Sequence, residues 1–161
     1  MPILTQNHLA NAMPDLFERV LLLKQSPMFS EVPTEGLRIV AKMLEEETYF
    51  AGDRVFDINE FGDHMYILQN GRVGISLSTD PSVKEFVAEL GAGECFGEMN
   101  LLDELPRSAT VHVLEDSTML SLEKARLRGL ILNYPELSIG MLRGLSLRLR
   151  KANLKNIGQK D

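Results

Sequence analysis

The chain has 161 residues, of which 44% are hydrophobic and 25% charged, and its formal net charge is −6. This composition is typical of one globular domain, and the acidic excess argues against direct DNA binding by this chain. Its apolar runs are too short for membrane insertion, and we expect no signal peptide because the N-terminus lacks a basic region followed by an apolar core. The single cysteine, Cys95, excludes an internal disulfide and fits a reducing, cytoplasmic location.

Residues 1–46 predict a helical segment. Apolar residues recur at helical spacing after Asp15, which is placed to cap the N-terminus of that helix: Leu16, Phe17, Val20, Leu21 and Leu23. Two prolines within residues 26–33 predict a break in the helical pattern. Thr34 is then expected to cap a second, shorter helix.

Residues 47–122 predict a sheet of short strands. Runs rich in Val, Ile, Phe and Tyr alternate with Gly, Asp and Asn, and we expect strands at residues 47–50, 54–56, 64–69, 73–77, 85–90, 109–113 and 118–121. Asn70 and Gly71 predict a two-residue hairpin turn because both tolerate positive φ. Turns spaced by about eight to twelve residues favour an antiparallel β-roll of the double-stranded β-helix or jelly-roll type.

Residues 123–161 predict two further helices. A first is expected from residue 121 to about residue 133, and Pro135 separates it from a second that continues to about residue 156. One face of the second helix is apolar, and it either packs on the chain's own strands or forms a homodimer with a second copy: Met141, Leu142, Leu145, Leu149 and Ala152. The basic residues after position 142 either form a solvated helix face or contact an acidic partner.

Residues 96–111, FGEMNLLDELPRSATV, form the most specific pattern of the chain. Glu98 follows a glycine, and Arg107 lies nine residues further on, after an apparent helical turn and a tight reversal. Such a pair can be an internal ion pair at a corner of the roll. It can also present backbone N–H groups, a guanidinium and a carboxylate to one small ligand, namely an anion that carries a sugar hydroxyl.

This stretch resembles the phosphate-binding cassette of the cyclic-nucleotide-binding domain family. That family includes the regulatory subunit of cAMP-dependent protein kinase, the catabolite activator protein and cyclic-nucleotide-gated channels. Its F-G-E and P-R-(A/S/T)-A motifs are matched by residues 96–98 and 106–109, with the same Glu-to-Arg spacing. Residues 62–67 are similar to a second family motif, G-D-x-M-Y-x-I, and the resemblance extends from about residue 21 to about residue 151.

Two positions depart from the family pattern. Asn59 stands where the family often has glycine, and we expect the turn to survive because asparagine tolerates the left-handed conformation. Asn100 replaces the usual small alanine within the cassette, which adds bulk and polarity close to the implied ligand.

The resemblance implies a cyclic nucleotide site. Arg107 would pair with the cyclic phosphate, the amides of Met99, Asn100 and Ala109 would donate to it, and Glu98 would accept a hydrogen bond from the ribose 2′-hydroxyl. The implied ligand-binding residues are Phe96, Gly97, Glu98, Met99, Asn100, Arg107, Ser108 and Ala109. Ser108 favours cAMP over cGMP as the ligand, since threonine at this position accompanies guanine recognition in some relatives.

The same resemblance implies a regulatory sensor with no catalytic residues, metal or cofactor. Binding would alter a hinge around residues 120–132 and bring a lid from residues 137–149 over the base, while the effector stays unidentified. An interaction module that keeps the fold without binding nucleotide is the alternative. A metal-dependent enzyme of cupin type is disfavoured, because no two of the three histidines lie within ten residues of each other.

Together these segments predict one α+β domain. We expect N-terminal helices in residues 1–46, a β-roll in residues 47–122 with the cassette at residues 96–111, and hinge and lid helices in residues 123–161.

Overall fold

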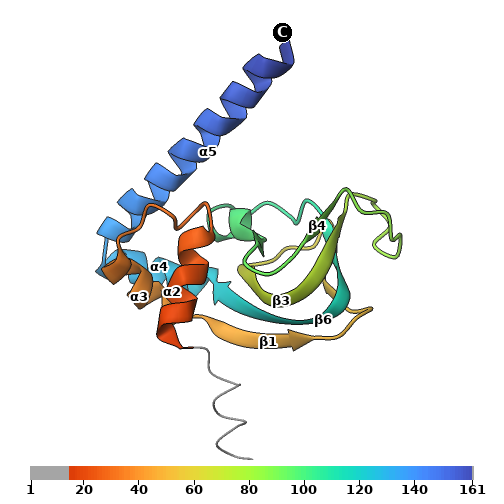
Figure 1. Ribbon diagram of the computed structural model, residues 1–161, viewed down its shortest axis with the longest axis horizontal. Helices are drawn as coiled ribbons and strands as arrows, with labels where there is room; N and C mark the ends of the chain where they lie inside the picture. The colour runs from red at the N-terminus through yellow and green to blue at the C-terminus, as the bar shows by residue number, and fades with distance from the viewer. Residues whose placement is uncertain (1–14, 161) are drawn as a thin grey trace, which may run out of the picture.

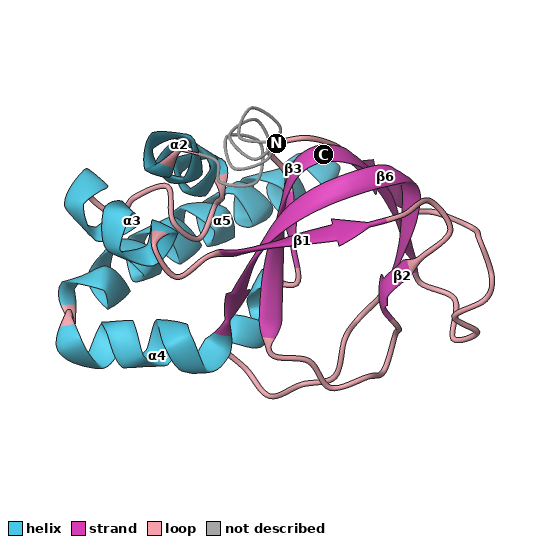
Figure 2. Cartoon of the chain, turned by 90° about the horizontal axis from the view of Figure 1, so that it is seen from below, coloured by secondary structure: helices cyan, strands magenta, loops and turns pink. Residues whose placement is uncertain are grey.

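A computed structural model describes residues 15–160, and residues 1–14 of the expected N-terminal segment, His8 included, lie outside the described residues. A curled antiparallel sheet forms one part of the molecule, and a group of helices covers one end of it (Figures 1 and 2). This arrangement confirms the predicted α+β class and its β-roll.

The sheet has six strands in the order β1-β6-β3-β4, with β2 also paired to β6 and β5 to β3. All of its pairings are antiparallel. The strand bounds are β1 Glu45–Tyr49, β2 Arg54–Phe56, β3 His64–Ser76, β4 Ala88–Leu90, β5 Cys95–Phe96 and β6 Thr110–Glu123. The long strands β3 and β6 pair along almost their whole length and curve together, which gives the roll its shape (Figure 1).

The predicted hairpin at Asn70 and Gly71 is wrong. Both residues lie within the continuous strand β3, where the register with β6 shifts on either side of them. Gly71 has φ +95°, and the Asn70 side chain accepts a hydrogen bond from the Thr118 N–H at 3.0 Å. Some bulges and the two-residue hairpin turns both place a residue at positive φ, so the same residue pair fits either. The runs at residues 109–113 and 118–121 are likewise parts of one strand, β6.

The helices follow the predicted order with shifted ends. Their bounds are α2 Leu16–Gln25, α3 Thr34–Ala41, α4 Lys124–Asn133 and α5 Glu136–Lys160. Asp15 caps α2 as predicted, because its carboxylate accepts from the Phe17 N–H at 3.4 Å. Thr34 is the first residue of α3 rather than its cap, a position that Pro33 occupies with extended backbone. The start of α4 moves past Glu123 because β6 stays paired to that residue.

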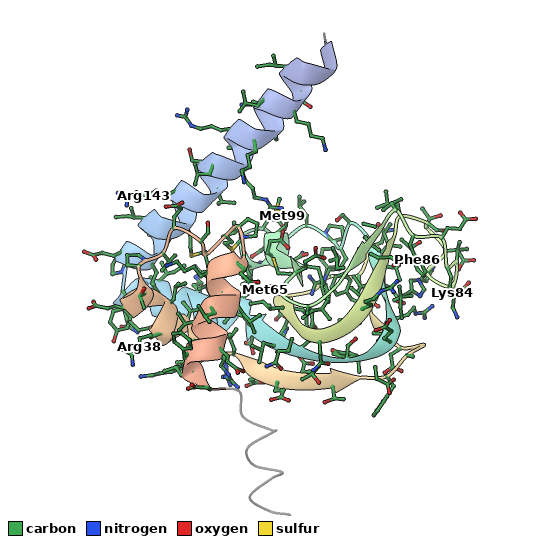
Figure 3. The ribbon with its side chains drawn as sticks, viewed as in Figure 1. Arg38, Met65, Lys84, Phe86, Met99 and Arg143 are labelled. Atoms are coloured by element: carbon green, nitrogen blue, oxygen red, sulfur yellow. The ribbon has the colours of Figure 1, made fainter. Side chains whose placement is uncertain are left out.

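Two apolar clusters form the core. One lies between the helices and the end of the sheet that they cover, where Met65 of β3 lies beside α2 (Figure 3). The other fills the inside of the roll and includes Tyr66 and Phe96. Successive residues of β3 enter different clusters because side chains alternate across a strand.

Helix α5 is held close to the body by two glycines. A Cβ atom at Gly140 would lie 2.8 Å from Val32 Cα, and one at Gly144 would lie 2.5 Å from the Pro27 carbonyl oxygen. Met141 is buried, but Leu142 and Leu149 are exposed, so the predicted apolar face packs on this chain only in part. The C-terminal half of α5 extends away from the body (Figure 1).

Candidate functional site

The predicted cassette forms a tight connection between two strands. It begins after β5 at Gly97, whose φ is +77°, and continues into the short 3₁₀ helix η1, Glu98–Leu101. A Cβ atom at Gly97 would lie 2.8 Å from Arg107 Nη1 and 3.0 Å from the His64 carbonyl oxygen. Glycine is therefore required here both for its conformation and for the space it leaves.

A cavity of about 250 Å³ lies against this connection. All eight residues predicted to bind ligand line it, together with five residues that complete an apolar wall: Phe56, Ile75, Leu90, Cys95 and Val111. Figure 3 places Met99 on the side of the roll that faces α5. The strand pattern alone could not identify the apolar wall, because the inward face of each strand depends on register.

Arg107 is buried, with 4% of its surface exposed. Its Nη1 donates to Asn100 Oδ1 at 3.1 Å and to the Gly97 carbonyl at 3.4 Å, and its Nη2 donates to the His64 carbonyl at 2.9 Å. The guanidinium carbon lies 3.9 Å from the centre of the Phe56 ring. Burial lowers the pKa of Arg107, but a guanidinium keeps its charge at neutral pH.

Asn100 connects two parts of the cassette. Its Nδ2 donates to the Leu105 carbonyl at 2.7 Å, and its Oδ1 accepts from Arg107. The family resemblance predicted that the backbone N–H of Asn100 would donate to the ligand. In the structure this N–H donates to the Gly97 carbonyl at 3.3 Å. The 3₁₀ geometry of η1 explains the difference, since it satisfies this amide within the helix.

Glu98 faces helix α5. Its Oε1 lies 3.0 Å from Arg148 Nη2, and the two side chains are 12% and 40% exposed. Arg148 falls within the predicted lid, residues 137–149, but no pattern in the sequence singled it out. It reaches Glu98 because Gly144, one turn earlier, sets the close approach of α5.

The described residues hold no group of three or more His, Cys, Asp or Glu side chains that could bind a metal ion. Likewise, between residues 15 and 160 no helix is long and apolar enough to cross a membrane. The cavity combines the Glu98 carboxylate and the Arg107 guanidinium with polar cassette groups and an apolar wall, which suits an anion attached to a ring with apolar faces.

Comparison with known proteins agrees with this geometry. The family model of the cyclic nucleotide-binding domain matches residues 46–134, more than half of the chain. The chain therefore belongs to the cyclic nucleotide-binding domain family.

Relatives of this chain include receptors and regulatory domains. It is 31% identical to the Cyclic AMP receptor protein of Thermus thermophilus over 133 residues, which cover 83% of this chain and 62% of that protein. The chain thus spans about three fifths of the length of the receptor-type relatives it matches.

The solved structures that share the fold include the following two. One is the N-terminal domain of a transcriptional regulator from Streptomyces coelicolor, with 29% identity, a TM-score of 0.73, and coverage of 82% of this chain and 92% of that one. The other is the regulatory domain of Toxoplasma gondii PKA with cAMP, with 25% identity, a TM-score of 0.66, and coverage of 71% and 44%.

Proposed function

We propose that this chain is a sensor that binds a cyclic nucleotide in the cavity beside η1, and cAMP in preference to cGMP. The observation that carries the proposal is the joint position of Glu98 and Arg107 on one cavity with an apolar wall. A cyclic phosphate has one negative charge and two exocyclic oxygens, which a guanidinium can bind in a fork. The ribose 2′-hydroxyl can donate to a carboxylate, and the purine can lie against apolar side chains.

The preference for cAMP rests on two supports. Ser108 lines the cavity in place of the threonine that accompanies guanine recognition in some relatives. The Thermus relative is named as a receptor of cyclic AMP, and the Toxoplasma regulatory domain was solved with cAMP.

The ion pair between Glu98 and Arg148 supports coupling of this site to helix α5. A ribose hydroxyl that donates to Glu98 would share the carboxylate with Arg148 and alter the position of the helix. A second connection runs through Lys124, at the start of α4, whose ammonium donates to the Asp103 carbonyl in the middle of the cassette, just after η1. Such coupling requires that the ligand bind the two helix positions with different affinity.

The exposed apolar residues of α5 support self-association as the output of this sensor. Leu142 and Leu149 are exposed and seven residues apart, and the half-buried Leu145 lies between them on the same face. A seven-residue spacing is that of helices paired in a coiled coil. We expect sedimentation analysis to detect a dimer that Leu149→Lys disrupts, and a monomer in both proteins would contradict this part of the proposal.

One observation favours the alternative, an interaction module without nucleotide binding. Both Nη1 hydrogens of Arg107 already have acceptors within the protein, Asn100 and Gly97. Titration of cAMP and, separately, cGMP into nucleotide-stripped protein distinguishes the two functions. If the chain is a sensor, both titrations should give saturable heat, with tighter binding of cAMP. If neither ligand gives heat or a thermal shift, the result favours the interaction module.

A further inference from the structure

We infer that Asn100 sets the nucleotide affinity of this site, because its carboxamide takes the place on Arg107 that a phosphate oxygen would need. The inference rests on the proposed function, in that the ligand concerned is the cyclic phosphate. It concerns how strongly that ligand binds, and it has a separate test that needs no ligand.

The orientation of the Asn100 carboxamide follows from its two contacts. Only its NH₂ group can donate, and the Leu105 carbonyl, 2.7 Å away, can only accept. The oxygen must therefore face Arg107, where it accepts from Nη1 at 3.1 Å. With 6% of its surface exposed, Asn100 has little access to water as a replacement partner.

The guanidinium of Arg107 has few donors left. Of its five N–H groups, three bond to Asn100, Gly97 and His64. Nε is buried and makes no hydrogen bond among the described residues. Both Nη1 hydrogens are thus occupied by neutral acceptors of the protein itself, the Asn100 oxygen and the Gly97 carbonyl.

A phosphate that binds through Nη1 must displace the Asn100 oxygen. The charged phosphate is the stronger acceptor, so the exchange can proceed, but it leaves a buried amide oxygen without a donor. That loss reduces the net affinity. With asparagine at position 100, a ligand binds only if its charge gains more free energy at Arg107 than the lost Asn100–Arg107 hydrogen bond costs. A smaller residue at this position would remove that cost.

Calorimetric titration of cAMP into four proteins tests the inference. Asn100→Ala should bind about 5- to 50-fold more tightly than the unaltered chain, because the phosphate no longer has to displace the Asn100 oxygen from Nη1. Asn100→Asp should bind at least about 10-fold more weakly, because its carboxylate pairs with Arg107 and repels the phosphate. Asn133→Ala, at an exposed asparagine on α4, is the matched control and should bind as the unaltered chain does.

The outcomes separate this inference from the proposed function. Binding by Asn100→Ala that is equal or weaker would overturn the inference while the sensor stands. If Asn100→Ala binds cAMP and the unaltered chain does not, the result supports the inference and explains why the unaltered chain gives no heat. If Asn100→Ala fails to fold, Asn100→Ser serves instead, because its shorter side chain cannot span the Leu105 carbonyl and Arg107.

If no protein binds cAMP or cGMP, the proposed function fails, and the reactivity of Arg107 then tests by itself the contact behind the inference, namely that Asn100 covers Nη1. Phenylglyoxal modifies free guanidinium groups, and peptide mass spectrometry measures the rate at Arg107. We expect that rate to rise several-fold in Asn100→Ala over the unaltered chain. Equal rates in the two folded proteins would overturn the inference.

Discussion

Arg148 on helix α5 lies 3.0 Å from Glu98 on η1, so one ion pair joins the longest helix of the chain to the candidate site. Other contacts of α5 with the body lie nearer its N-terminal end, at Leu137, Gly140 and Gly144. The ion pair lies beyond these contacts along α5. A change at the cavity that breaks the pair can therefore free more of the helix from the body.

Replacing Arg148 with Ala should remove the ion pair to Glu98 and so weaken the coupling between α5 and the ligand site. Because the pair is partly exposed, we expect the free energy of unfolding to fall by less than about 1 kcal/mol. Hydrogen exchange along α5 should respond to cAMP in the unaltered chain and respond much less in Arg148→Ala. Arg150→Ala is the control on the same helix, and an equal response in all three proteins would contradict the coupling.

Glu98 should confer selection for ribose. A hydrogen bond to a charged group contributes about 1.5–3 kcal/mol, so the unaltered chain should prefer cAMP to 2′-deoxy-cAMP by about 10- to 150-fold. In Glu98→Ala the two ligands should bind within about threefold of each other. Retention of the full preference in that variant, measured by competition binding, would remove Glu98 from the ribose contact.

Gly62 should be required for the position of Arg107. A Cβ atom at Gly62 would lie 2.3 Å from Arg107 Nε, so Gly62→Ala must displace the guanidinium. We expect a loss of about 1–3 kcal/mol in unfolding free energy, together with weaker binding of cAMP. Gly91→Ala is the matched control, since a Cβ atom there meets nothing within 4 Å. Denaturant titration that finds equal losses in the two variants would contradict this contact.

His112 should make the stability depend on pH. It is buried beside Phe86, at the far end of the roll from the helices (Figure 3), and burial, with smaller effects of Arg54 and Lys84, lowers its pKa. The unfolded chain, with a histidine pKa of about 6.5, then binds the proton more readily than the folded protein does. The neutral His112 side chain therefore contributes fully to the free energy of unfolding above about pH 6.5, and this contribution is lost as the pH falls below that value.

Denaturant titrations between about pH 7.5 and 5 measure this effect. The unfolding free energy of the unaltered chain should decline with falling pH more steeply than that of His112→Gln. Equal slopes in the unaltered chain and in His112→Gln would show that this histidine does not contribute.

The cassette residues were predictable because they are close in sequence. A glycine, a carboxylate and an arginine at fixed spacing on one short connection are held near one another by the connection itself, and all eight predicted residues line one cavity. Asn59 was predictable on the same local ground, and it adopts a left-handed φ of 71°.

Long-range features were not predictable in this way. The contact of Arg148 with Glu98 depends on where α5 crosses the loop before α3, which Gly140 and Gly144 determine through contacts with residues more than a hundred positions away. The bulge at Gly71 depends on the pairing of β3 with β6, because its local conformation also suits a hairpin.

The most direct test of the account is calorimetric titration of cAMP into the unaltered chain, Arg107→Lys and Arg107→Ala. Arg54→Ala, at an exposed arginine paired with Asp57, serves as the control. If Arg107 binds the phosphate, removal of the guanidinium costs about 2–5 kcal/mol, a loss of about 30- to 5,000-fold in affinity, and lysine restores only part of it. An affinity of folded Arg107→Ala within about threefold of the unaltered chain would contradict the account.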